Sequence, residues 1–220
     1  MILSNNTIST LKNFSSINPS IMMKKGNILR TISPQKSVMA MATLDQDIEG
    51  DAGIYDLSRF LSTISLFDEP ELGFGENKFT IKGGRSRVNY TYASESMILT
   101  PPDKEINLPS VDVTAEVKWD DFDKVMRAAS VLKLSDIAFI GDKDGIRLAA
   151  VDVSNPSADM FDLVLDETPQ SSTFQMVFRS ENLKLLPGDY KVEISSKGIS
   201  KFQSSTVTYY VAVETTSTFK

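Results

Sequence analysis

The sequence predicts an α+β protein in which two similar domains follow one another along the chain. Most of its 220 residues fall into short segments, several of which alternate apolar and polar side chains, as half-buried antiparallel strands do. A few amphipathic helical segments interrupt them. Each half of the chain reads helix, strands, helix, strands, and a repeated order of elements indicates a duplicated domain.

Tight-turn signals at 83–84, 142–145 and 196–198 separate several of the expected strands. The strands are expected at 27–32, 38–44, 78–82, 85–92, 136–140, 145–151, 160–165, 174–178, 190–194 and 206–213. The tail, 215–220, is expected to be a loose end.

The first well-defined helix is predicted at 56–64, where the Asp56 carboxylate can cap the first turn. Arg59 falls on the face opposite an apolar stripe of 3.6-residue spacing. The stripe consists of Leu57, Phe60, Leu61 and Ile64. We therefore expect this helix to bury one face and expose Arg59.

A second helix is predicted at 120–132, with an acidic first turn that suits the helix dipole. Lys124 and Arg127 lie opposite its apolar stripe, which consists of Phe122, Val125, Met126 and Ala129. Weaker helical patterns cover 7–17, with Lys12 at the edge of the stripe, and 180–186.

Between the halves, 100–112 is expected to form an extended connector, because its prolines, Pro101, Pro102 and Pro109, disfavour a helix. The predicted domains are therefore 1–99 and 113–220.

The composition excludes several kinds of chemistry. The chain has no cysteine and no histidine, so disulfides, zinc sites of the usual kind and Ser-His-Asp or Cys-His catalysis are ruled out. The acidic pairs Asp45/Asp47, Asp120/Asp121 and Asp142/Asp144 fit a strand end, a helix first turn and a hairpin turn better than a metal or nuclease site. We expect no cofactor and no metal, although a carboxylate- or lysine-based enzyme stays open at this point.

The formal net charge of −6 argues against a generic nucleic-acid binder. Any contact with nucleic acid must come from local placement of a minority of Lys and Arg. The N-terminus lacks the pattern of a secretory signal, and no apolar run approaches the ~20 residues of a membrane span. We therefore expect a soluble, intracellular protein.

Several short segments carry a resemblance to a known family. They are Leu3-Ser4, 10–14 (Thr-Leu-Lys-Asn-Phe), 17–22 (Ile-Asn-Pro-Ser-Ile-Met), 54–61 (Ile-Tyr-Asp-Leu-Ser-Arg-Phe-Leu), 184–191 (Lys-Leu-Leu-Pro-Gly-Asp-Tyr-Lys) and 210–214 (Tyr-Val-Ala-Val-Glu). In this order, and over nearly the whole chain, they resemble the trimeric sliding clamps of T4-like bacteriophages.

The resemblance implies a non-enzymatic DNA polymerase processivity factor. Three copies would join head to tail into a ring around double-stranded DNA, with antiparallel sheets outside and helices lining the hole. The implied partners are the replicative DNA polymerase, an ATP-driven clamp loader and late-transcription factors, in the cytoplasm of an infected bacterium. The alternative from another class is a β-rich viral structural or assembly protein.

In such a ring the helix faces opposite the core line the hole and face the DNA. Cations on these faces can bind phosphates without reading the bases. The expected DNA-facing residues are Lys12, Lys24, Lys25, Arg59, Lys124, Arg127, Lys133 and Lys184. Without the ring, the same cations are simply the solvated sides of amphipathic helices. The resemblance also implies a partner-peptide pocket at the connector, near Ile106, Leu108 and Pro109, whose alternative is packing of the connector onto its own domain.

Overall fold

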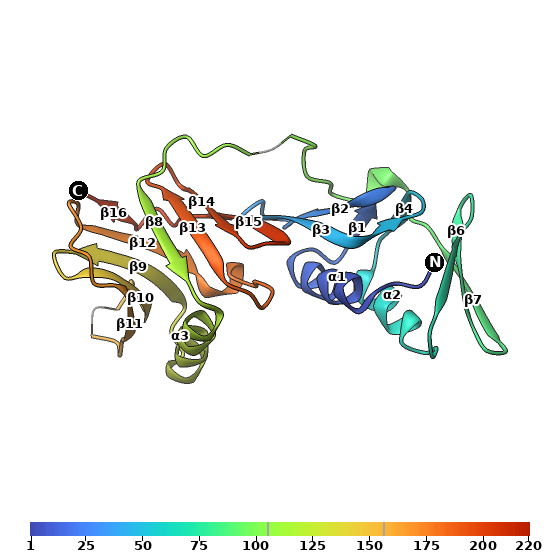
Figure 1. Ribbon diagram of the computed structural model, residues 1–220, viewed down its shortest axis with the longest axis horizontal. Coiled ribbons are helices and arrows are strands. Elements are labelled where there is room, and N and C mark those ends of the chain that lie inside the picture. The colour runs from blue at the N-terminus through green and yellow to red at the C-terminus, as the bar shows by residue number, and fades with distance from the viewer. Residues whose placement is uncertain (105, 156) are drawn as a thin grey trace. The chain divides into compact units, whose positions relative to one another are not determined.

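The computed structural model (Figure 1) describes residues 1–104, 106–155 and 157–220. The chain divides into two compact units, Met1–Lys104 and Glu105–Lys220. The predicted connector, 100–112, spans this division and includes Glu105, which lies outside the described residues. Helices pack on antiparallel sheets in both units, so the predicted α+β class is confirmed.

The N-terminal unit begins with a helix and is otherwise mostly strands. Its elements are α1 (Asn5–Ile17), β1 (Ile21–Met23), β2 (Gly26–Ile32), β3 (Val38–Ile48), β4 (Ala52–Ile54), α2 (Leu57–Ile64), β5 (Glu71–Phe74), β6 (Lys78–Gly83), β7 (Ser86–Thr91) and the 3-10 turn η1 (Glu95–Met97). Antiparallel pairing joins β1 to β4, β2 to β3, and β5, β6 and β7 in that order.

The core of this unit lies where α1 and α2 pack beside each other and α1 packs against β3 (Figure 1). Leu11 and Phe14 of α1 are fully buried, as are Leu57 and Phe60 of α2. The Phe60 ring lies 5.0 Å from that of Phe79 on β6. Aromatic packing thus ties α2 to the three-stranded sheet.

The C-terminal unit has one long helix and two antiparallel sheets. Its elements are β8 (Val113–Val117), α3 (Trp119–Leu132), β9 (Asp136–Asp142), β10 (Gly145–Val151), β11 (Phe161–Asp166), β12 (Phe174–Arg179), the 3-10 turn η2 (Ser180–Asn182), β13 (Tyr190–Ser195), β14 (Ile199–Gln203), β15 (Val207–Ala212) and β16 (Thr218–Phe219). One sheet has the order β11-β10-β9-β12-β16, and the other contains β8, β13, β14 and β15.

Three phenylalanines join the two sheets of this unit. The rings of Phe139 on β9 and Phe178 on β12 lie 6.2 and 5.7 Å from that of Phe202 on β14. All three side chains are buried. The helix α3 packs against β9, β10 and β11 on the first of these sheets.

The two best-defined helix predictions are confirmed to within a residue, and the helix predicted from residue 7 begins at Asn5. The helix predicted at 180–186 is wrong, because only one 3-10 turn forms there. Leu183 and Leu185 are both buried. Burial of side chains two residues apart is typical of an extended segment, in which alternate side chains point to the same side. Pro187 and Gly188 follow directly.

The expectation of a loose C-terminal tail is also wrong. Thr218 and Phe219 form β16, which pairs with β12. The Phe219 ring stacks on Phe174 with 6.2 Å between centroids, and the Lys220 amide donates to the Thr173 carbonyl at 2.9 Å. An aromatic side chain near the end of the chain therefore anchors it.

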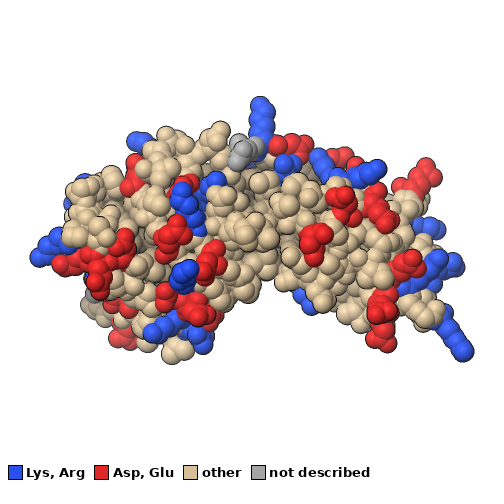
Figure 2. All heavy atoms as spheres, in the orientation of Figure 1, with Lys and Arg blue, Asp and Glu red and all other residues tan. Residues whose placement is uncertain are grey.

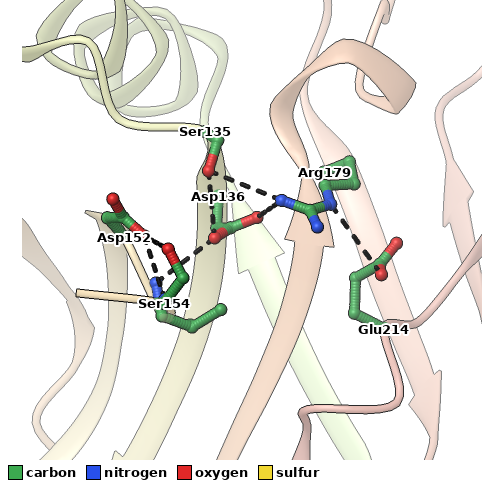
Figure 3. Close-up of polar contacts among 7 residues, drawn as sticks. Ser135, Asp136, Asp152, Ser154, Arg179 and Glu214 are labelled. Atoms are coloured by element: carbon green, nitrogen blue, oxygen red, sulfur yellow. Dashed lines mark hydrogen bonds and ion pairs between the residues drawn. The ribbon is translucent and has the colours of Figure 1, made fainter. Parts of the chain in front are cut away.

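A polar network holds the junction between β12 and η2 (Figure 3). The Asp136 side chain is 1% exposed, and its Oδ1 accepts from Arg179 Nη1 at 2.9 Å. Ser135 Oγ and the Val153 amide donate to Oδ2 at 3.2 and 3.3 Å. Arg179 Nε also lies 3.9 Å from Glu214 Oε2. The Asp136 carboxylate thus links β9, β12 and the segment after β10.

The substitution Arg179→Met should destabilise the protein, because it leaves the Asp136 charge buried without its cation. A buried pair broken on one side costs roughly 3–5 kcal/mol, and since Arg179 is half exposed we expect about 2 kcal/mol. Urea unfolding at one fixed protein concentration measures this difference.

The matched control is Arg59→Met, which removes an arginine that is exposed and forms no ion pair in the described part of the chain. Its unfolding free energy should stay within about 0.5 kcal/mol of the parent protein. Equal losses for the two variants would contradict a specific role for the Asp136–Arg179 pair.

Candidate nucleic-acid interface

The helix α3 presents two cations to solvent because its opposite face is held by the core. Phe122, Val125 and Ala129 are buried, and 3.6-residue periodicity then directs Lys124 and Arg127 outward. Both are exposed. Packing of the buried face alone therefore orients the Lys124 and Arg127 side chains toward solvent.

A residue from a distant part of the chain caps the N-terminus of α3. The helix's own N-cap, Lys118, makes no side-chain capping bond. Instead, Asp189 Oδ1 accepts from the Trp119 amide at 2.9 Å, and its Oδ2 accepts from Lys118 Nζ at 2.8 Å. Lys118 and the Trp119 amide lower the pKa of Asp189 below its usual value. Asp189 precedes β13, so the second sheet fixes where α3 begins.

Arg127 has a local partner, and Lys124 has none among the residues that the structure describes. Arg127 Nη2 lies 2.9 Å from Asp123 Oδ2, one helical turn away, and the Arg127 side chain is 72% exposed. An exposed pair of this kind contributes only about 0.3–0.5 kcal/mol. Arg127 can therefore exchange Asp123 for a phosphate at little cost.

Lys133 ends α3 in the left-handed region, with φ of 57°. Glycine is the usual residue at such a position. The Lys133 amide bonds the carbonyls of Ala129 and Ser130, and the side chain is exposed. Its charge lies at the negative end of the helix dipole, which favours a cation.

The helices of the N-terminal unit each expose one cation on an otherwise uncharged face. Lys12 of α1 and Arg59 of α2 are both exposed, and neither helix contains an acidic residue within its bounds. Asp56 caps α2 as predicted, with its Oδ1 accepting from the Arg59 amide at 2.8 Å. Local charge on these faces is thus positive although the whole chain is acidic.

The remaining predicted cations lie outside the helices. Lys24 and Lys25 connect β1 to β2, where Lys24 Nζ lies 3.3 Å from Asp103 and the Lys25 amide donates to Asp51. Lys184 is exposed in the segment between η2 and β13. The structure therefore brings only part of the predicted set onto helix faces, namely Lys12, Arg59, Lys124 and Arg127, with Lys133 at the end of α3.

The predicted pocket residues do not line the small cavity found at the start of the connector. That cavity, of about 30 Å³, is lined by side chains that include Ile21, Met22, Ile28, Leu99 and Pro101. Asp103 also lines the cavity and forms ion pairs there with Lys24 and Arg30. Ile106 and Leu108 are half-buried and Pro109 is exposed.

Sequence reasoning missed a second basic surface, which we call the β6–β7 basic face. It consists of Lys78, Lys82, Arg85 and Arg87, all exposed. Alternation along β6 buries Phe79 and Ile81 and turns the lysines outward. Blue side chains project over β6 and β7 in Figure 2. The spacing of Lys78 and Lys82 was the available signal, but strand lysines commonly mark ordinary solvated faces.

Across residues 1–104, 106–155 and 157–220, no cluster of acidic side chains is arranged to hold a metal ion. Within the same residues, no helix has the length and apolar character needed to cross a membrane.

Comparisons with known proteins cover the whole chain. Residues 4–100 match the family described as DNA polymerase processivity factor, and residues 114–215 match the family described as gp45 sliding clamp, C terminal. The sliding clamp of Escherichia phage RB69 is 34% identical over 227 residues, covering 99% of each chain. The sliding clamp of Vibrio phage KVP40 is 32% identical over 220 residues, covering 97% of this chain and 99% of that one.

Among solved structures, A. fulgidus PCNA, solved with the C-terminal region of FEN-1, aligns with a TM-score of 0.67. The two chains are 16% identical, and the alignment covers 94% of each. At this identity the likeness concerns the fold alone.

The capping role of Asp189 predicts an acid transition in the fluorescence of Trp119, the single tryptophan of the chain. Because the pKa of Asp189 is lowered, its carboxylate stays charged until the pH falls below the ordinary pKa of an aspartate. Protonation then removes the acceptor of the Trp119 amide, so the emission should change only below that pH. A fluorescence titration measures it.

Asp189→Asn should abolish this transition and alter the emission already at neutral pH. Asp152→Asn is the matched control, since the pKa of Asp152 is also lowered, by hydrogen bonds from Ser154; this variant should keep the transition. An unchanged acid transition in Asp189→Asn would show that other carboxylates cause it.

Proposed function

The chain belongs to the sliding-clamp family of T4-like bacteriophages, and from this premise we propose that three copies close head to tail into a ring around duplex DNA. The membership confirms the resemblance seen in the sequence. The ring would carry sheets outside and α1, α2 and α3 inside, facing the duplex.

The observation that carries this proposal is the placement of cations on the helices. Lys12, Arg59, Lys124 and Arg127 lie on exposed helix faces, in a chain whose formal net charge is −6. Cations that contact only phosphates bind DNA without reading its sequence. An acidic exterior repels DNA elsewhere. Contacts of this kind are weak, salt-sensitive and mobile, as sliding requires.

Lys133, Lys24, Lys25 and Lys184 complete the proposed DNA-facing set. Their placement in loops or at a helix end supports a smaller contribution to DNA contact than that of the helix cations. Lys24, in addition, already pairs with Asp103. Long lysine side chains in such positions can reach phosphates as the duplex moves.

The clamp would serve the replicative DNA polymerase as its processivity factor. A tethered polymerase has a raised effective concentration at the primer end, so it rebinds before it diffuses away. The role is topological and needs no active site of the clamp's own. A separate ATP-driven loader would open the ring, and the setting would be the cytoplasm of an infected bacterium.

Partner peptides would bind beside the connector, at Ile106, Leu108 and Pro109. Ile106 and Leu108 are half-buried, so part of each apolar side chain is exposed and could contact a bound peptide. The same surface would serve late-transcription factors, for which the moving clamp is a platform.

Reversing charge on α3 tests the DNA-facing assignment. Lys124→Glu with Arg127→Glu replaces two cations per subunit by anions, and we expect loading onto primed circular DNA to fall roughly tenfold or more at ~0.1 M salt. The paired control is Lys143→Glu with Lys197→Glu, which reverses two exposed lysines in hairpin turns of the sheets. This control should load normally.

Mass measurement in solution accompanies the assay, because the variant must remain a trimer for its result to count. Intact trimers with unchanged loading and processivity would contradict the assignment. A parent protein that stays monomeric at every concentration, or forms large open assemblies, would contradict the ring itself and favour a viral structural protein.

A further inference from the structure

The end of the connector is bound by hydrogen bonds to the turn between β13 and β14. We call this group the connector clasp, and it consists of Ser110, Asp112, Ser195, Ser196 and Lys197. All of these residues belong to the C-terminal unit. Leu108 and Pro109, two of the residues proposed to bind partner peptides, immediately precede the clasp in the chain.

The Asp112 carboxylate is the acceptor on which the clasp depends. One of its oxygens, Oδ2, accepts from Ser110 Oγ and from the Ser196 amide, both at 2.7 Å. Hydrogen bonds to a charged acceptor are shorter and roughly twice as strong as those between neutral groups. The Ser196 amide and the Ser110 hydroxyl hold the pKa of Asp112 below its usual value. The carboxylate is therefore charged at neutral pH.

The hydroxyl hydrogens of the clasp have a single consistent order. A serine hydroxyl carries one hydrogen, and Ser110 donates its own to Asp112. In the 2.7 Å contact between the Ser110 and Ser195 hydroxyls, Ser195 must then be the donor. The Lys197 amide in turn donates to Ser195 Oγ at 3.2 Å. The donors form a chain that ends on Asp112, and bonds in such chains strengthen one another.

The backbone at the end of the connector is held as well. The Asp112 amide donates to the Ile194 carbonyl at 2.9 Å, and the next residue, Val113, begins β8 opposite Ile194 of β13. Ser195, whose hydroxyl bonds to Ser110, is fully buried. The clasp therefore joins the connector to a buried part of the sheet.

The chain between the clasp and Leu108 is short and stiff. The ring of a proline such as Pro109 fixes φ at about −65°, and the residue before a proline is restricted to extended conformations. Ile106, Leu108 and Ser110 are half-buried, whereas Asn107 and Pro109 are exposed. This alternation is typical of an extended segment. Fixing Ser110 therefore also fixes the direction in which Leu108 and Ile106 point.

We propose that Ser110 is a positioning residue for partner peptides, held by Asp112 and Ser195 so that Leu108 and Ile106 keep one arrangement. The inference rests on the proposed binding of peptides at the connector. It adds to that proposal the residues that preorganise the surface. The partner segment that fits such a surface carries apolar side chains, and Ser110 acts without touching it.

Preorganisation raises affinity because a flexible segment loses conformational entropy when a partner orders it. In the clasped connector this entropy is lost during folding, before a peptide arrives. Without the clasp the loss falls on the binding step. Affinity for the partner should then decrease although every side chain that touches the peptide is unchanged.

Removal of one hydroxyl tests the proposal. Ser110→Ala deletes the central hydroxyl of the clasp, and we expect it to weaken binding of the cognate replicative DNA polymerase to the full chain about tenfold. Ser110→Thr keeps a hydroxyl at the same position and should bind within about threefold of the parent. Biolayer interferometry with immobilised polymerase measures both dissociation constants.

Hydrogen exchange of the backbone amides distinguishes positioning from a general loss of stability. In Ser110→Ala the amides of 106–108 and 110–111 should exchange faster, whereas those of α3 should keep the parent's rates. Faster exchange at the connector with unchanged polymerase affinity would overturn the proposal. So would a Ser110→Thr variant that unfolds at the parent's urea midpoint yet binds as weakly as Ser110→Ala.

Ser154→Ala is the matched control. Ser154 Oγ donates to Asp152 Oδ1 at 2.6 Å and its amide donates to the same oxygen at 2.9 Å, so this variant also removes a hydroxyl bonded to an aspartate. Its polymerase affinity should equal that of the parent. An equal loss of affinity in Ser154→Ala and Ser110→Ala would contradict a role specific to the connector.

Leu108→Ala separates this inference from the function on which it rests. If Leu108→Ala weakens polymerase binding and Ser110→Ala does not, the docking surface stands and the positioning role is overturned. If neither variant weakens binding, the docking surface at the connector is overturned together with the inference. Weaker binding in both variants, with recovery in Ser110→Thr, is the result that we expect.

Discussion

Burial of one apolar face of each helix against antiparallel sheets is the constraint from which the other features follow. A core side chain such as Phe122 or Val125 contributes roughly 1.5–3 kcal/mol when buried, whereas an exposed ion pair such as Arg127–Asp123 contributes less than about 1 kcal/mol. Packing therefore decides which way α3 faces, and its charges follow. The same holds for Phe60 and Arg59 on α2.

The chain carries exposed cations both on its helices and on the β6–β7 basic face. The helix cations stand on uncharged or mixed faces and are spread over α1, α2 and α3, which fits weak contact with a moving phosphate backbone. The β6–β7 basic face is compact and includes the edge strand β7. An acidic chain can thus carry local positive charge without becoming a general polyanion binder.

Elements that depend on local periodicity could be predicted from the sequence. Features that depend on contacts between distant residues could not. The stripes of α2 and α3 were readable because Leu57, Phe60, Phe122 and Val125 repeat at helical spacing. Residues 180–186 were predicted to be a helix because the spacing of their leucines fits both a helix and an extended segment. Only packing in the core determines that Leu183 and Leu185 lie in an extended segment. The capping of α3 by Asp189 could not be read, since 70 positions separate Asp189 from Trp119. The strands β5 and β8 were also missed.

The central claim is that copies of this chain enclose DNA, and linearising a loaded circle tests it most directly. Clamps loaded on nicked circular plasmid by their cognate loader are washed in high salt, and the plasmid is then cut once with a restriction enzyme. A closed ring should stay on the circle through the wash and leave once the DNA has ends. Loss from the intact circle in high salt, or equal retention on circular and linear DNA, would contradict encirclement.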